Sequence, residues 1–343
     1  METGTFSVES LFNFIAAKPK IISIIGMEKN CGKTTLLNFL LKGMADKDIP
    51  TLVLSIGRDG EPLDTVENTK KPEITIYKGG FFLTIGELIK NPSNVEILEC
   101  FDEKVSGSKI ILSRALQNTK IQLINPGNQK ILSRMIKQSI NRCGDCLVFI
   151  DGALDRLSHG SSSLIDGVFV CTGVQTDGTL TQIVEKTKRL ITNLENKECS
   201  QNLKGLILNR KSDCGSLLIR NQKIMSCMPG TLLDSTKLDE KIKNNDIIYT
   251  TGVLTDKIIR RFIDREVSVT IILTDGTQCH FSQRYHALME RRGIALRLLN
   301  SIPVYGLSVN SVGIRRSMNP SKVLKAFREA FEDKWVFDTQ YLM

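Results

Sequence analysis

The chain has 343 residues, of which 41% are apolar and 24% are charged. These proportions are typical of folded globular proteins and exclude a disordered or fibrous class, and the length suits about two domains. Lysine and arginine total 46 against 37 aspartate and glutamate residues, a net charge of +9. The basic residues are spread along the chain, and only five Tyr and one Trp are available for base stacking. We therefore expect no nucleic acid as a partner.

The N-terminal segment does not show the pattern of a secretory signal. Glu2 and Glu9 stand where a basic start is usual, and the apolar patch that follows is short. No apolar run reaches the ~18 residues of a membrane-spanning helix. We therefore expect a cytoplasmic protein with no membrane partner.

Nine cysteines, an odd number, are expected to be reduced thiols, mostly buried, in an intracellular protein. Cys143 and Cys146 form one C-x-x-C pair, and no second pair with ligand spacing follows. Structural thiols, half of a metal or iron–sulfur site and a redox pair therefore all stay open for these two residues.

Apolar runs of strand length alternate with helical patterns along much of the chain. The first are a strand at 20–25, a helix at 36–44 and a strand at 51–56. Residues 77–137 are less regular, and we interpret them as an insert that covers one sheet edge. The alternation resumes with strands at 146–150 and 167–171, a helix at 179–194 and a strand at 205–208. This pattern predicts an α/β fold with a parallel sheet and helices on both faces.

A second α/β series follows the turn signals at Pro229 and Gly230. Its strands are expected at 247–251, 267–273, 295–299 and 304–309, and its helices at 255–263, 283–292 and 321–331. We therefore expect an N-terminal domain at 1–228 and a smaller C-terminal α/β domain at 229–343.

The segment IISIIGMEKNCGKTTLLNFLL carries the clearest functional signal. It has the pattern of a buried strand, a loop that contains Gly26 and Gly32, and a helix that begins at Lys33. Loop amides and the helix N-terminus form a positive cradle for phosphate oxygens, a lysine reaches the terminal phosphates, and a threonine hydroxyl binds Mg²⁺. The pattern predicts a P-loop for a nucleoside triphosphate in the domain 1–228; the alternative is a glycine turn that opens a helix without nucleotide. The candidate binding residues are Gly26, Asn30, Gly32, Lys33, Thr34 and Thr35, with Thr34 also a Mg²⁺ ligand.

Five residues separate the two glycines of this loop, where the common motif has four. The same spacing is found in dethiobiotin synthetase and in cobyric acid synthase-like amidotransferases, so the loop resembles that branch of P-loop proteins. In that branch the position of Asp59, in SIGRDGE, is similar to an acidic residue that holds the Mg²⁺ water or the attacking water. The alternative is a turn, because Arg-Asp-Gly is also good turn chemistry.

Asp151 ends the apolar segment CLVFID, a pattern similar to a Walker B strand. Mg²⁺ prefers oxygen ligands, and a carboxylate at a strand end beside the loop supplies one directly or through water. Lys33, Asp59 and Asp151 are therefore the candidate catalytic residues, and both aspartates are candidate metal ligands. Asp155 and the serines at 161–163 are further candidates for the γ-phosphate or a partner substrate.

Asn209 ends the segment GLILN, at a position where relatives of the dethiobiotin synthetase type place an asparagine against the nucleobase. We therefore expect Asn209 to contact the base. The guanine-specific pattern N-K-x-D is not met, because Ser212 stands where the aspartate is required. This favours ATP over GTP.

The segments GMEKNCGKTT, SIGRDGE, IDGALDR and GLILNR together resemble the B subunit of the lysine 5,6-aminomutase reactivase (KamB). The resemblance extends to TTGVLTD and to residues 304–310, with departures at Cys31 and at Asn310-Ser311-Val312, where Asn-Pro is expected. It implies a helper protein that hydrolyses a nucleotide and reactivates an adenosylcobalamin-dependent aminomutase. The implied partners are that mutase and a second reactivase subunit, and the implied cofactors are ATP or GTP with Mg²⁺.

Two other functions stay open. One is an ATP-dependent ligase or kinase of the dethiobiotin synthetase type, which transfers a phosphoryl group to a small molecule near Asp151. The other is a scaffold that holds a nucleotide for stability alone. A Mg²⁺-dependent ATPase or GTPase is expected under the helper interpretation.

Overall fold

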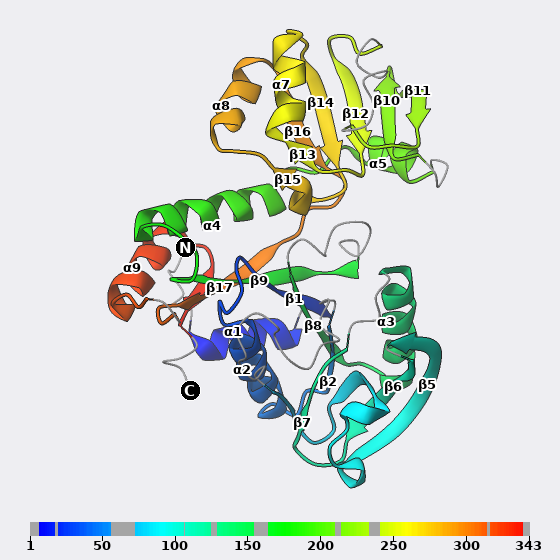
Figure 1. The fold of residues 1–343 in the computed structure, drawn as a ribbon, viewed down its shortest axis with the longest axis vertical. Coiled ribbons are helices and arrows are strands. Elements are labelled where there is room, and N and C mark those ends of the chain that lie inside the picture. The colour runs from blue at the N-terminus through cyan, green and yellow to red at the C-terminus, as the bar shows by residue number, and fades with distance from the viewer. Residues whose placement is uncertain are drawn as a thin grey trace. The chain divides into compact units, whose positions relative to one another are not determined.

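The computed structural model describes residues 7–17, 20–55, 73–105, 107–124, 129–153, 164–209, 214–232, 241–313 and 316–338. The chain forms two compact units (Figure 1). The first unit takes the described parts of 1–156, 164–187 and 304–343, and the second unit takes those of 188–303. The chain therefore returns to the first unit after it has built the second, whereas the sequence alone predicts two domains in succession, 1–228 and 229–343.

The first unit contains a nine-stranded sheet. Its strand order is β18-β17-β9-β1-β8-β2-β4-β6-β5. The pairs from β18 to β4 are parallel, and β6 is antiparallel to both β4 and β5. The strands are β1 (Ile21–Gly26), β2 (Thr51–Ser55), β4 (Phe81–Ile85), β5 (Val95–Val105), β6 (Ser108–Ala115), β8 (Leu147–Ala153), β9 (Gly167–Gly173), β17 (Val304–Asn310) and β18 (Trp335–Phe337).

The central strands are apolar because both faces of this sheet are covered. All seven residues of β9 and the four central residues of β1 are buried, as expected for parallel strands between helical layers. The remaining elements of this unit are α1 (Val8–Ala17), α2 (Lys33–Ala45), α3 (Gln129–Cys143), α9 (Pro320–Ala330), the antiparallel pair β3 (Ile74–Ile76) and β7 (Thr119–Ile121), and the short 3₁₀ turns η1 (Gly86–Leu88) and η2 (Pro92–Asn94).

Helix α2 packs its apolar side against β1 and α1. Leu36, Leu37 and Leu40 are completely buried, and burial of each such side chain stabilises the fold by roughly 1.5–3 kcal/mol. Phe12 of α1 lies 5.2 Å from Phe39, ring centre to ring centre. This packing holds α2 rigidly, so that its first turn has a fixed position at the end of β1.

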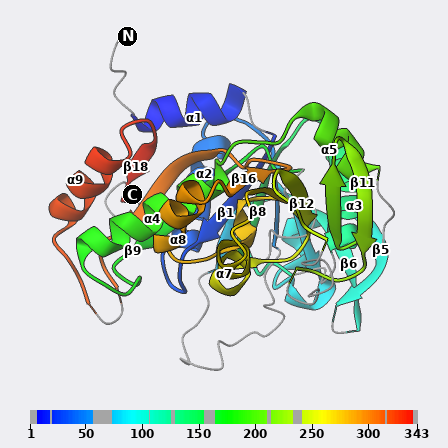
Figure 2. The ribbon, with the colours of Figure 1, turned by 90° about the horizontal axis from the view of Figure 1, so that it is seen from above.

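The second unit contains a five-stranded mixed sheet in the order β11-β10-β12-β14-β16. The strands β12, β14 and β16 are parallel, and β10 is antiparallel to β11 and β12. Its elements are α5 (Gln201–Leu208), β10 (Ser216–Arg220), β11 (Lys223–Met228), β12 (Asp246–Thr250), β13 (Leu254–Thr255), α7 (Asp256–Asp264), β14 (Val269–Leu273), η5 (Gly276–Gln278), β15 (Cys279–His280), α8 (Arg284–Arg291) and β16 (Ala295–Leu298). Helix α5 lies against the hairpin of β10 and β11 in both views (Figure 1, Figure 2). Helix α4 (Leu180–Leu194) contributes residues to both units.

The α/β prediction is confirmed, since the chain has a large, mostly parallel sheet and a smaller mixed sheet. Three local predictions differ from the structure. Residues 77–137 extend the sheet through β4, β6 and β5 rather than merely covering its edge. The predicted strand at 304–309 pairs with β9 in the large sheet instead of joining the later series, because its almost fully buried pattern matches β9.

The predicted strand at 205–208 was wrong, because these residues form the end of helix α5. Ser200 caps this helix and accepts a hydrogen bond from the amide of Leu203 at 3.4 Å. A short apolar run such as GLIL does not distinguish a strand from a helix segment. The Ser200 cap favours the helix, and so does the burial pattern, because Ile207 is buried while its helix neighbours are not.

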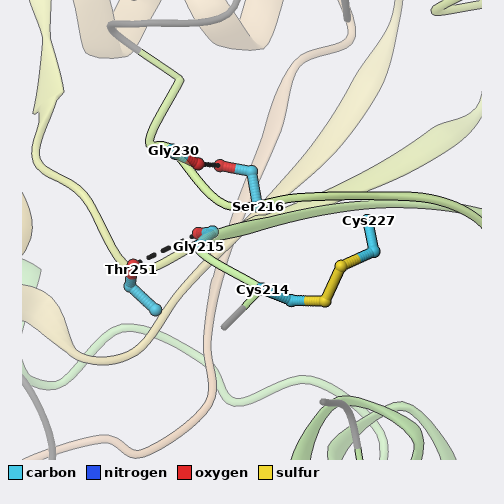
Figure 3. The surroundings of a disulfide bond; sticks show 6 residues. All are labelled: Cys214, Gly215, Ser216, Cys227, Gly230 and Thr251. Atoms are coloured by element: carbon cyan, nitrogen blue, oxygen red, sulfur yellow. Dashed lines mark hydrogen bonds between the residues drawn. A yellow bond between two sulfur atoms is a disulfide. The ribbon is translucent and has the colours of Figure 1, made fainter. Parts of the chain in front are cut away.

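The prediction that all cysteines are thiols was also wrong. Cys214 and Cys227 form a disulfide in the second unit, with 5.5 Å between their Cα atoms (Figure 3). The hairpin brings them together, because the amide of Gly215 donates to the carbonyl of Met228 at 2.7 Å. The other seven cysteines are free thiols.

Candidate functional site

The loop after β1 lies at the carboxyl edge of the large sheet. Strand β1 ends at Gly26, and helix α2 begins at Lys33, with Gly32 as its N-cap. Gly32 has a φ of 94°, which favours glycine, and it brings no side chain to cap the first turn of α2. Thr34 and Thr35 lie in that first turn and are half-buried. The structure thus brings together every predicted loop residue in the strand, loop and helix order that the sequence indicates.

Gly26 allows the loop to fold back tightly over the strand end. A Cβ atom at this position would lie 2.5 Å from the sulfur of Cys31 and 2.9 Å from Nζ of Lys33. Asn30 has a φ of 57°, and the amide of Met27 donates to the carbonyl of Cys171 on β9 at 3.0 Å. The ammonium of Lys33 therefore lies directly over the carboxyl end of β1.

Asp151 lies on β8, the strand next to β1. It is the register partner of Ile24 on β1 and of Ser55 on β2, and its side chain is half-buried. Burial raises the pKa of the Cys171 thiol well above its usual value, and the charges of Lys33 and Asp151 both act on this pKa in opposite directions. Lys33 Nζ lies beside the Cβ position of Gly26, and Asp151 is paired with Ile24, two residues earlier on the same strand, so the lysine and the aspartate lie on the same face of the sheet.

Several predicted site residues cannot be placed. Asp59 falls in 56–72, and Asp155 and the serines at 161–163 fall in 154–163; both segments lie outside the described residues. Their predicted roles stay predictions.

Asn209 does not lie at a strand end. It is the exposed C-cap of α5 in the second unit, and its amide donates to the carbonyl of Gly205 at 3.1 Å. The expected base contact assumed that residues 205–208 form a strand whose end faces a ligand. The structure removes that assumption, since these residues are helical.

Asn310 is a residue that sequence reasoning did not include in the site. It ends β17, is 9% exposed, and donates from Nδ2 to the backbone carbonyl of Asn30 at 3.4 Å. Its Oδ1 accepts a hydrogen bond from the amide of Val312 at 3.1 Å. A Cβ on Gly173 would collide with the backbone of Asn310, so this glycine permits the close approach of β17. An apolar strand that ends in asparagine, VYGLSVN, is the signal that could have found it.

Polar contacts hold the loop that follows Asn310. Arg316 donates to the carbonyls of Val174 at 2.6 Å and Gly178 at 2.8 Å, and also to that of Thr176. The hydroxyl of Ser311 donates to the buried carboxylate of Asp338, just after β18. These contacts fix the loops that follow β9, β17 and β18, all at the same sheet edge as the loop after β1.

The described residues fit a Mg²⁺-bound triphosphate at this edge. The ammonium of Lys33 beside Gly26 and the carboxylate of Asp151 on the neighbouring strand are of the kinds that bind phosphate and Mg²⁺. Within the described ranges no three His, Cys, Asp or Glu side chains are grouped to hold a metal. Nucleotide-bound Mg²⁺ needs only one or two protein oxygens, because phosphates and water supply the rest.

Comparison of the chain with protein-family models, with curated proteins and with solved structures finds no match. None of the helices in the described ranges has both the length and the apolar character that crossing a membrane requires.

Proposed function

We propose that this chain is a P-loop protein that binds and hydrolyses a nucleoside triphosphate with Mg²⁺. The observation that carries the proposal is the position of Lys33, whose ammonium is folded back over Gly26 at the end of β1. A lysine that begins a helix and folds back over the preceding strand is suited to bind terminal phosphates. Its positive charge, the loop amides and the positive end of the helix dipole all attract negatively charged phosphate oxygens.

Each residue has a separate task in this proposal. Lys33 and the loop amides bind the β- and γ-phosphates, the hydroxyl of Thr34 and the carboxylate of Asp151 hold Mg²⁺ or its water, and Asp59 is proposed to orient the attacking water. Mg²⁺, when bound, neutralises charge on the phosphates. Phosphoryl transfer depends on positioning and charge neutralisation more than on a covalent nucleophile. The proposed hydrolysis therefore needs no nucleophilic side chain in addition to these residues.

We propose that the loops after β17 and β18 contact the base of the nucleotide. Asn310 donates to the carbonyl of Asn30 in the phosphate loop and ends the strand that lies two places from β1, on the side away from β8. In this proposal the nucleoside lies on that side of a ligand whose phosphates lie over Gly26. We propose Asn310 in place of Asn209 as the base-side asparagine. Ser311 and Gly313 stand where the guanine-specific pattern that begins at Asn310 requires lysine and aspartate, so ATP remains favoured.

The nucleotide is proposed to serve a partner enzyme. The resemblance to the lysine 5,6-aminomutase reactivase points to an adenosylcobalamin-dependent aminomutase, assisted by a second reactivase subunit. A helper of this kind uses the nucleotide to select a conformation to which its partner binds better, and hydrolysis then resets it.

The test is hydrolysis of ATP and of GTP by the purified protein with Mg²⁺, with and without a cobalamin-dependent aminomutase preparation. Stimulation by the mutase, stronger for ATP, is the expected result. Turnover that ignores the mutase but responds to added small-molecule acceptors would favour the ligase or kinase. Tight binding with no hydrolysis under either condition would favour the scaffold.

A further inference from the structure

The side chain of Cys31 occupies the space that Gly26 leaves free. Its sulfur lies 2.5 Å from the position of an added Cβ at Gly26. Cys31 is fully buried, whereas the three residues before it in the loop are exposed. The sulfur therefore lies beneath the phosphate loop, on the sheet face toward which a side chain of Gly26 would point.

Cys171 lies on the same face. Gly26 and Cys171 are direct register partners in the parallel pair of β1 and β9, and side chains of directly paired residues point to the same side of a sheet. Cys171 is also fully buried, and both cysteines belong to one apolar cluster. The thiol of Cys171 is therefore a neighbour of the Cys31 sulfur.

The surroundings of the two thiols link them to the phosphate site. Lys33 Nζ and Cys31 Sγ lie within 2.9 and 2.5 Å of the same point beside Gly26. The pKa of the Cys171 thiol is raised by its burial and by the neighbouring Cys31, and it is lowered by the charge of Lys33. A covalent change at either sulfur would therefore act on the side chain that is proposed to bind phosphate.

We propose that Cys31 and Cys171 form an oxidation site beneath the phosphate loop that reacts with small-molecule disulfides such as oxidised glutathione. One cysteine loses its proton, attacks the small disulfide as a thiolate and forms a mixed disulfide, and the small thiolate that leaves takes up a proton. The second cysteine then attacks the protein sulfur of that mixed disulfide and releases the other small thiol. One sulfur–sulfur bond joins the cysteines, and the two electrons and two protons leave with the two small thiols.

The new bond ties residue 31 to β9 and prevents the loop from adjusting around a triphosphate. Because both sulfurs are buried, an oxidant reaches them only when the loop opens, and a bound triphosphate that holds the loop closed protects them. The effect on binding rests on the proposed function, whereas formation of the bond does not.

The experiment treats the full chain with oxidised glutathione, with and without ATP and Mg²⁺, and maps disulfides by mass spectrometry of unreduced peptides. We expect a peptide pair joined through Cys31 and Cys171 that forms more slowly with ATP. Binding of a fluorescent ATP analogue should weaken by about tenfold or more after oxidation, because the loop amides and the lysine act only in one geometry. Dithiothreitol should restore it.

Cys171→Ala should abolish both the linked peptide and the sensitivity of binding to oxidation. Two control proteins should retain both the linked peptide and the sensitivity to oxidation. One carries Cys100→Ser, which removes an exposed thiol of β5, and the other carries Cys143→Ser together with Cys146→Ser, which removes the C-x-x-C pair. Oxidation that leaves only glutathione adducts, or no linked pair in the wild-type chain and in both controls, overturns the inference. Failure of the reduced protein to bind triphosphate would count against the proposed function, while the linked peptide would still decide the cysteine pair.

Discussion

Lys33 and Asp151 place opposite charges on neighbouring elements, one on the first turn of α2 and one on β8, two residues before its end. Both charges act on the pKa of the buried Cys171 thiol, the lysine lowering it and the aspartate raising it. A cation for the phosphates beside a carboxylate for Mg²⁺ is the minimum that a Mg²⁺-nucleotide site needs from side chains. Predictions at the scale of single residues follow from this pair and from Asn310.

Asp151→Asn should leave the fold intact and reduce Mg²⁺-dependent hydrolysis by roughly 100-fold, because the amide is a weaker ligand and has no negative charge. The measurement is the hydrolysis rate over a Mg²⁺ titration. Asp145→Asn is the matched control, since Asp145 precedes the opposite end of the same strand and forms an exposed ion pair with Lys20 at 2.8 Å, a contact of little energetic weight. Equal rates for the two variants would contradict the role of Asp151.

Asn310→Ala should weaken ATP binding by about tenfold, because it removes a polar base-side group and the hydrogen bond to the loop carbonyl of Asn30. Preference for ATP over GTP should fall as well. The comparison variant is Asn209→Ala, which should bind both nucleotides like the wild type. If Asn209→Ala weakens binding and Asn310→Ala does not, the base-side assignment made from the sequence is right and the present one is wrong.

At the scale of elements, the mixed sheet of the second unit depends on a buried carboxylate at the start of β12. Asp246 is 1% exposed and accepts from Nε and Nη2 of Arg220, each at 2.7 Å, and from the amide of Lys243 at 2.8 Å. Burial alone raises the pKa of Asp246, but the hydrogen bonds from Arg220 and Lys243 outweigh it, and the pKa is lowered. The ionised carboxylate therefore joins β10, β12 and the turn before β12.

Asp246→Asn should destabilise the second unit by about 3 kcal/mol near neutral pH, because it leaves the arginine without its charged partner. A lowered folded-state pKa means that the stabilisation is fully present above the unfolded-state pKa of about 3.9 and is lost as the pH falls below it. The difference between variant and wild type should therefore shrink toward pH 2–3. Hydrogen exchange of β12 amides at several pH values measures it, and a difference independent of pH would contradict the ion-pair account.

Helices and strands were predictable where a single segment contains both the apolar spacing of the element and the residues that end it. The strand that ends at Gly26, the loop with Gly32 and the helix that begins at Lys33 follow from glycine positions and apolar spacing alone. The strand at 205–208 failed because a four-residue apolar run fits a helix equally well, and its decisive cap, Ser200, lies outside that run.

At the scale of the whole molecule, the features that sequence reading missed are contacts between distant segments. The pairing of β17 with β9 and the disulfide between Cys214 and Cys227 join segments that are separated along the chain. Local sequence patterns carry no information about which separated segments meet. The contact of Asn310 with Asn30 is of the same kind, since it forms only when the chain comes back to the first sheet after the second unit. Structure within one segment was therefore predictable, whereas the contacts that complete this edge of the sheet were not.

The measurement that tests the central claim most directly is equilibrium binding of ATP and GTP to the wild type and to Lys33→Ala, with Lys42→Ala as the control. Lys42 is exposed on the same helix, so its loss should change neither fold nor binding. Removal of a charge-assisted contact worth about 1.5–3 kcal/mol should weaken triphosphate binding roughly 10- to 100-fold in Lys33→Ala, while its circular dichroism spectrum and melting curve stay those of the wild type. Unchanged affinity for both nucleotides in a folded Lys33→Ala protein would contradict the phosphate site.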